Sequence, residues 1–181
     1  MSQPFVQTIQ KDWFGEVIFP PVRLALTLTE TDLLFTASRA TTAKPHPQSS
    51  EGKFLTELWR YDVAELFLLE PESGRYLEIN LAPNGGWWAC WFVRMREPSP
   101  EQPNFESLPI HAKGELSESH WDASIRLPLS LFENPATLRY NFTAIVNSPK
   151  QRFLTAFPLG PEQPDFHQPS RFQPLPSSNH S

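Results

Sequence analysis

The stretch DVAELFLLEPESGRYLEINLAPNGGWWACWFVR, residues 62–94, contains three short hydrophobic segments separated by two turn sequences. The segments are Val63–Leu69, Tyr76–Leu81 and Trp87–Arg94, and the turns contain Pro-Glu-Ser-Gly and Pro-Asn-Gly-Gly. Short segments rich in branched and aromatic side chains, bounded by Gly, Pro and Asn, are typical of β-strands. This stretch therefore predicts three consecutive strands of an antiparallel sheet.

The same type of pattern continues on both sides of this stretch. Residues 22–29 alternate leucine with alanine and threonine, and residues 33–39 follow after a short polar segment, so the two predict a hairpin. One helical turn is expected at residues 128–133, because proline is tolerated at the first position of a helix. Further strands are expected at residues 111–116, 122–127, 138–146 and 153–157.

This series of short strands favours an all-β fold. The chain lacks the alternation of strands and helices that characterises parallel α/β proteins. We therefore expect an antiparallel β-sandwich or jelly roll of about 8–10 strands. It should form a single domain over residues 1–172, followed by a loose C-terminal tail at residues 173–181.

The composition excludes several other classes. The 181 residues include 20 prolines, 7 glycines and 14 phenylalanines, and the formal charge is -5. So few glycines exclude collagen, and this aromatic content with little net charge is unlike a disordered chain. Proline costs about 3 kcal/mol inside a helix, which excludes a long helical bundle. The prolines avoid the alternating segments and cluster at residues 45–47, 98–109 and 158–176, so they mark loops and a C-terminal segment that wraps around the domain.

The charges and the single cysteine bear on partners and location. With 15 basic and 20 acidic residues, the chain lacks the basic character of nucleic-acid-binding domains, so we expect no nucleic-acid partner. No apolar run approaches the roughly 18 residues of a membrane span, and the first residues lack a signal-peptide pattern, so we expect no membrane association. Cys90 cannot form an intrachain disulfide and is expected to be a small buried side chain. These features favour a cytoplasmic protein.

Three segments in order resemble the DOMON-like superfamily, and within it family 9 carbohydrate-binding modules. They are residues 58–89, residues 121–132 followed by 138–145, and residues 164–172. The resemblance covers about residues 13–172. It implies a β-sandwich in which one sheet face, or its rim, holds a sugar or another small ligand. Members of this group are usually attached to secreted glycosidases or redox proteins, whereas we expect this chain to be a stand-alone domain.

Polar side chains on the predicted strands are the candidates for this site. Side chains two residues apart on a strand point to the same side, which groups Tyr76 with Glu78 and Asn80. Sugar hydroxyls donate and accept hydrogen bonds, so converging carboxylates, amides and a guanidinium would bind them. The alternative is a solvated sheet face on which Glu78 and Arg139 form only a cross-strand charge pair. The polar residues expected to bind the ligand are Glu65, Tyr76, Glu78, Asn80, Arg139 and Asn141.

Tryptophan side chains offer flat surfaces for sugar rings. Trp87 and Trp88 are adjacent, so one must point into the core while the other is available as a platform beside the Gly-Gly turn. We include both as ligand-binding candidates. Trp91 shares the face of Trp87. The remaining tryptophans are expected to pack in the core or at its rim; they are Trp13, Trp59 and Trp121.

Catalysis is a less favoured alternative. Glu65 and Glu78 could serve as a general acid and base, as paired carboxyl groups do in glycosidases. The chain contains no G-x-S-x-G, P-loop or H-E-x-x-H motif that would indicate another reaction. We therefore expect a binding module without catalytic residues.

Cofactors and protein partners remain as further alternatives. Some DOMON relatives bind haem through His or Met, and Met95 paired with His46, His111 or His120 could supply such ligands here. The histidines show no metal-ligand spacing, so no metal site is expected. His167 is expected to fix the C-terminal segment by hydrogen bonds. A structural role is also open, with the proline-rich loops or the C-terminal tail contacting a protein.

Overall fold

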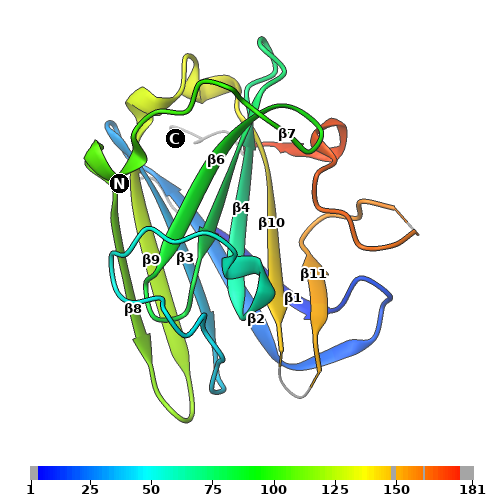
Figure 1. The fold of residues 1–181 in the computed structure, drawn as a ribbon. Coiled ribbons are helices and arrows are strands. Elements are labelled where there is room, and N and C mark those ends of the chain that lie inside the picture. Colours follow the sequence, from blue (N-terminus) through cyan, green and yellow to red (C-terminus); the bar gives the residue numbers. More distant parts are fainter. Residues whose placement is uncertain (1–3, 148–149, 161, 176–181) are drawn as a thin grey trace, which may run out of the picture.

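The computed structural model describes residues 4–147, 150–160 and 162–175. These residues form a five-stranded sheet, ordered β1-β2-β3-β9-β8, and a seven-stranded sheet, ordered β11-β10-β4-β5-β6-β7 with β12 beside β10. Neighbouring strands pair antiparallel, and the two sheets pack face to face (Figure 1). The structure confirms the predicted all-β sandwich.

The strand bounds agree closely with the sequence pattern in the middle of the chain. Strands β4 (Val63–Leu69), β5 (Tyr76–Leu81) and β6 (Trp87–Arg94) have the predicted limits. The remaining strands of this sheet are β7 (Glu97–Pro98), β10 (Arg139–Val146), β11 (Arg152–Thr155) and β12 (Gln173–Pro174). The other sheet contains β1 (Phe5–Lys11), β2 (Val17–Leu28), β3 (Asp32–Arg39), β8 (His111–Leu116) and β9 (Trp121–Pro128).

The helical segments among the described residues are short 3-10 turns. The turn predicted at residues 128–133 is present as η3 (Leu129–Leu131). The others are η1 (Leu58–Arg60), η2 (Phe105–Ser107), η4 (Pro135–Thr137) and η5 (Pro169–Arg171).

The predicted hairpin of residues 22–29 and 33–39 is present as the antiparallel pair β2–β3, but the chain before it differs from the prediction. Strand β1 was not expected, and β2 begins at Val17 and includes Pro20 and Pro21 within its length. The β1–β2 pairing changes register between Ile9 and Lys11. Proline is tolerated where the ladder of hydrogen bonds is interrupted, which explains how these two residues fit inside a strand.

The main core lies between the two sheets. Side chains that alternate along the strands meet there, and the rings of Phe35 and Phe142 stack across the interface with centroids 5.6 Å apart. Leu77, Ile79 and Leu81 form one core-facing row of β5, as predicted. Such burial is the main favourable contribution to folding.

The outer face of the seven-stranded sheet is also buried, so the alternative of a solvated sheet face is wrong. A second hydrophobic cluster covers it, in which Leu159, Phe166 and Phe172 of the C-terminal segment pack against the sheet (orange to red in Figure 1). Every residue of β4 is buried. Cys90 is buried in the same cluster, as predicted.

The C-terminal segment stays close to the sheet to the end of the described chain. The backbone N–H of Leu175 donates to the carbonyl of Leu138 over 3.1 Å, just after β12 pairs with β10. The start of the expected loose tail therefore lies against the domain. The rest of that tail, residues 176–181, falls outside the described residues.

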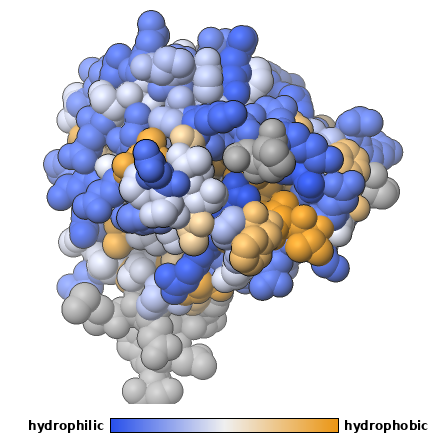
Figure 2. Space-filling view, turned by 90° about the horizontal axis from the view of Figure 1, so that it is seen from below, coloured by the Kyte–Doolittle hydropathy of each residue, from blue (hydrophilic) through white to orange (hydrophobic). Residues whose placement is uncertain are grey.

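Figure 2 shows the molecule from below, where a compact hydrophobic area interrupts a mainly hydrophilic surface. Large exposed hydrophobic side chains occur around the β1–β2 turn and the first part of β2, namely Phe14, Val17 and Phe19. None of these three lines the cavity described below. Within the described residues, no helix has the length and hydrophobicity needed to cross a membrane.

Candidate ligand-binding site

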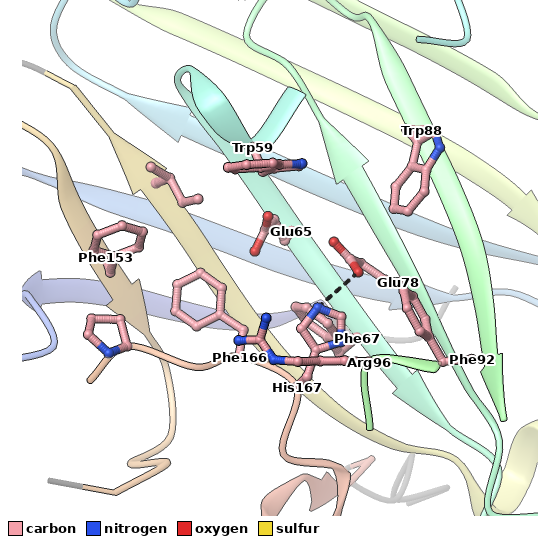
Figure 3. Close-up of a pocket in the computed structure, with 12 residues that line it drawn as sticks. Trp59, Glu65, Phe67, Glu78, Trp88, Phe92, Arg96, Phe153, Phe166 and His167 are labelled. Carbon is pink, nitrogen blue, oxygen red and sulfur yellow. Dashed lines mark ion pairs between the residues drawn. The ribbon is translucent and has the colours of Figure 1, made fainter. Parts of the chain in front are cut away.

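A cavity of about 400 Å³ lies on the outer face of the seven-stranded sheet, beneath the C-terminal segment. Figure 3 shows polar groups at its centre and aromatic rings around them. The polar side chains that line it are Glu65, Glu78, Arg96 and His167. The aromatic side chains are Trp59, Phe67, Trp88, Phe92, Phe153 and Phe166, and Ile145 and Pro164 complete the lining.

The strand register brings the two glutamates together. Glu65 of β4 lies opposite Asn80 of β5, and Asn80 in turn lies opposite Trp88 of β6. Glu78 lies opposite Phe67 in the next row, so Glu65 and Glu78 are diagonal neighbours on adjacent strands. Both carboxyl groups point into the cavity (Figure 3).

Burial strongly perturbs Glu65. Only 2% of the residue is exposed, and the sole hydrogen bond of its side chain among the described residues is donated by Thr143 Oγ1 to Glu65 Oε2, at 2.6 Å. Burial, followed by the nearby Glu78 carboxylate, raises the pKa of Glu65 to about 8, although the Thr143 hydrogen bond acts in the opposite direction. The other oxygen, Oε1, remains free to accept a hydrogen bond from a ligand.

Glu78 is perturbed in the same direction. Burial raises its pKa to about 7, while the Asn80 amide and Arg96 act to lower it. The Asn80 amide lies near enough to lower this pKa by hydrogen bonding, but neither of its side-chain atoms makes a hydrogen bond of normal geometry with any described residue. Two adjacent carboxylates in a buried site repel each other, so the pair retains at least one proton near neutral pH.

A chain of hydrogen bonds fixes His167 beside Glu78. The backbone N–H of Arg96 donates to Tyr76 Oη over 3.1 Å, and Tyr76 Oη lies 2.8 Å from His167 Nδ1. Burial, followed by the charge of Arg96, lowers the pKa of His167 to about 4. The imidazole is therefore neutral, and its other ring nitrogen, Nε2, lies 3.4 Å from Glu78 Oε2.

Arg96 closes one side of the cavity from the turn after β6. Its backbone has a φ of 59°, in the left-handed region that non-glycine residues seldom adopt. The guanidinium donates to Asp165 Oδ1 over 2.8 Å, and the same carboxylate oxygen accepts the backbone N–H of His167. Arg96 and Asp165 thus tie the β6–β7 turn to the C-terminal segment and offset each other's charge.

The structure brings part of the predicted site together. Glu65, Glu78 and Trp88 line the cavity. Three other predicted residues are buried on the same sheet face without lining it; they are Tyr76, Asn80 and Asn141. Asn141 Nδ2 donates to Thr155 Oγ1 over 2.9 Å, whereas both side-chain atoms of Asn80 lack a hydrogen-bond partner among the described residues.

Two residues that were predicted to bind the ligand, Trp87 and Arg139, lie away from the cavity. Trp87 points into the main core, is 3% exposed, and its Nε1 donates to the carbonyl of Gly52 over 3.1 Å. Trp88 is therefore the tryptophan of this pair that faces the cavity, as the alternation along β6 requires. Arg139 Nε donates to the carbonyl of Phe172 over 2.7 Å, and Arg139 lies opposite Leu69 in the sheet. It fastens the C-terminal segment and forms no pair with Glu78.

Several lining residues were not predicted as ligand contacts. Trp59 was expected only in the core or at its rim, and His167 only as an anchor of the C-terminal segment. The Tyr76–His167 hydrogen bond supports that anchoring, but these residues are 91 positions apart and no local pattern connects them. Arg96 lies in a turn with no strand periodicity, so its direction follows only from the folded chain.

The residues considered as haem ligands are not gathered at this cavity. Met95 lies exposed in the β6–β7 turn, and none of Met95, His46, His111 and His120 lines the cavity. His111 belongs to the five-stranded sheet, and His120 Nε2 lies 3.8 Å from Asp122 Oδ2 beside the same sheet.

Solved structures similar to this chain define its structural class. A "putative carbohydrate-binding protein" from Bacteroides uniformis superimposes with a TM-score of 0.73 at 17% identity, covering 93% of this chain and 84% of the other. A family 9 carbohydrate-binding module from Caldicellulosiruptor kristjanssonii in complex with cellotriose gives a TM-score of 0.56 at 13% identity, covering 97% and 86%. A module from the same organism in complex with glucose gives 0.55 at 13%, covering 92% and 81%. The fold is that of carbohydrate-binding modules.

In sequence, the chain is similar to UPF0462 protein C4orf33 and its homologues. It is 31% identical to the Rattus norvegicus homologue over 138 residues, or 72% of this chain and 66% of the rat protein. Identity to the Homo sapiens protein is 30% over 130 residues, covering 68% and 62%. The chain thus spans just under two thirds of the length of these two relatives. No family model matches the chain.

Proposed function

We propose that this protein is a non-catalytic binding module that holds a sugar or a similar small polar ligand in the cavity beneath the C-terminal segment. One observation carries the proposal. A cavity of about 400 Å³ combines two indole rings with buried carboxyl groups whose oxygens retain free acceptor capacity. Its volume falls in the range of about 300–1,000 Å³ that is typical of small-molecule sites.

The lining suits the chemistry of a sugar. The C–H faces of a sugar ring can pack against Trp59 and Trp88, which contribute large contact areas at small entropic cost. Glu65 and Glu78 can accept hydrogen bonds from hydroxyl groups, and a protonated carboxyl group of the pair can also donate. Family 9 modules of the same fold were solved with cellotriose and with glucose, which supports neutral sugars as the first ligands to examine.

Binding is preferred to catalysis because the solved structures of this fold are described as binding proteins. Incubation with chromogenic glycosides tests this part of the proposal. We expect no release of the leaving group above that of a Glu78→Gln variant. Turnover that is lost in that variant would show that the glutamate pair is catalytic.

Isothermal titration calorimetry with a panel of mono- and oligosaccharides tests the binding itself. We expect at least one sugar to bind, and Trp88→Ala to weaken that sugar at least about tenfold because the ring loses its aromatic contact. Phe19→Ala is the matched control, since Phe19 is 87% exposed and lies outside the cavity. The absence of binding across the panel at millimolar concentrations would refute the proposal.

A further inference from the structure

The two carboxyl groups at the centre of the cavity have no Lys or Arg ion-pair partner among the described residues, and this bears on the ligand of the proposed function. Arg96 forms an ion pair with Asp165, and His167 is neutral because its pKa is lowered to about 4. Among the described residues, no Lys or Arg forms an ion pair with Glu65 or Glu78. The centre of the cavity therefore holds two carboxyl groups that share at least one proton and that no Lys or Arg of the described residues pairs with.

The same glutamates also have unused hydrogen-bonding atoms. Glu65 is 2% exposed and Glu78 is 6% exposed. Of the carboxyl oxygens of these two residues, only Glu65 Oε2 accepts a hydrogen bond of normal geometry from a described residue. Both side-chain atoms of the fully buried Asn80, in the row between Glu65 and Trp88, also lack partners there. Buried polar groups without partners destabilise a fold, so a ligand that donates several hydrogen bonds here would be stabilising.

Aromatic rings surround these carboxyl groups. In Figure 3, Trp59 and Trp88 lie on one side of Glu65 and Glu78, while Phe67 and Phe92 lie near His167 on the other. The faces of aromatic rings attract cations, most strongly when the cation is withdrawn from water. An ammonium group is the small cation that combines attraction to such rings with three hydrogen-bond donors.

We propose that the cavity prefers a sugar carrying a protonated primary amine, with the ammonium group between Glu65 and Glu78 and the sugar ring against Trp59 and Trp88. This preference rests on the proposed sugar-binding function and narrows its ligand class to amino sugars. The same acidic centre disfavours sugars that carry carboxylate or phosphate groups.

Binding of an ammonium group is coupled to the protons on the glutamate pair. A cation between the two carboxyl groups stabilises their ionised forms, so the pair releases protons when it binds, which a neutral sugar does not cause. The other titratable groups packed around the pair come from β5, β6, the β6–β7 turn and the C-terminal segment. They are Tyr76, Cys90, Arg96, Asp165 and His167.

Calorimetry at pH 6.5 tests the preference with monosaccharides that carry a free amine at C2, C3 or C6. Each amine is compared with its N-acetylated form and with the parent hydroxyl sugar, which are both uncharged at that position. We expect at least one amine to bind tenfold or more tightly than both counterparts. Titrations in buffers of different ionisation enthalpy should show proton release for that amine and none for the counterparts.

Variants assign the effect to the glutamates. In Glu78→Gln the ratio of amine to hydroxyl affinity should fall at least tenfold, and Glu65→Gln provides the same comparison if the first variant does not fold. Glu115→Gln is the control, because Glu115 is an exposed carboxylate on β8 of the opposite sheet. The ratio of amine to hydroxyl affinity in this variant should equal that of the unmodified protein.

The outcomes separate the two proposals. Neutral sugars that bind as tightly as every amine tested would overturn the amine preference and leave the proposed function intact. An amine preference that persists in both glutamine variants would also overturn it. Failure of every sugar, charged or neutral, would overturn both proposals together.

Discussion

Glu65 shows how a single buried acid links the site to the stability of the fold. Its raised pKa means that the folded protein binds a proton more tightly there than the unfolded chain does. Glu78 acts in the same sense, and His167 in the opposite sense because its pKa is lowered. The pH dependence of unfolding therefore reports on the environment of the cavity in the absence of any ligand.

We predict that the protein loses stability as the pH rises from 6.5 to 8. In the unfolded chain the glutamates ionise near pH 4.5, while in the folded state Glu65 and Glu78 ionise near 8 and 7. His167 adds stability with rising pH only up to its ordinary value of 6.5. Above that point the glutamates dominate, and the free energy of unfolding should fall by about 1 kcal/mol per pH unit.

Urea denaturation at several pH values measures this slope. Glu65→Gln should flatten it, because the amide does not ionise, while Glu115→Gln should leave it unchanged. A free energy of unfolding that stays constant or rises between pH 6.5 and 8 would contradict the described burial of the pair.

At the scale of elements, the β5–β6 turn holds the site strands against the opposite sheet. Gly85 in this turn has a φ of 82°, and a Cβ placed there would lie 2.6 Å from the backbone nitrogen of Gly114 in β8. This approach is closer than any real Cβ contact allows. The two sheets therefore meet at this corner through glycine backbones.

Gly85→Ala should destabilise the protein by at least about 2 kcal/mol, because the new methyl group combines backbone strain with overpacking. Gly74→Ala isolates the strain, since Gly74 has a φ of 73° and a Cβ added to it would meet no atom within 4 Å. It should cost only about 1 kcal/mol. Thermal or urea unfolding of both variants makes the comparison, and equal losses would contradict the close approach.

Elements also show what the sequence can and cannot predict. Alternation and turn residues sufficed for β4, β5 and β6, because local periodicity determines which side chains face the core. The start of β2 was missed because Pro20 and Pro21 are strand breakers except where pairing is irregular. The burial of the outer sheet face was missed because a distant segment covers it.

The candidate site, like the fold, was predictable where local periodicity determines the direction of a side chain and unpredictable where a distant segment does. Periodicity along the strands identified Glu65, Glu78 and Trp88, which line the cavity. It could not identify Arg96 or His167, because their positions depend on a turn and on a segment far along the chain. The remaining candidates lie on the predicted strands, but burial or hydrogen bonding to the C-terminal segment directs them elsewhere.

At the scale of the whole molecule, the cavity exists because the C-terminal segment crosses the outer face of the seven-stranded sheet. Strands β4, β5 and β6 supply the carboxyl groups and Trp88, while the returning segment supplies His167 and Phe166. The sandwich alone would leave these groups in water, where hydrogen bonds and charge contacts contribute little. The covered cavity is therefore the feature that distinguishes this surface from an ordinary sheet face.

The six tryptophans allow the most direct test of ligand binding in this cavity. Trp59 and Trp88 line it, whereas Trp87, Trp91 and Trp121 are buried in the main core. Their indole N–H signals in a nitrogen-15 correlation spectrum can be assigned by single Trp→Phe substitutions and followed during titration with neutral and amino sugars. We predict that a binding sugar shifts the signals of Trp59 and Trp88 and leaves those of the three core tryptophans in place. Unchanged signals with every sugar, or shifts confined to the core tryptophans, would contradict a sugar site in this cavity.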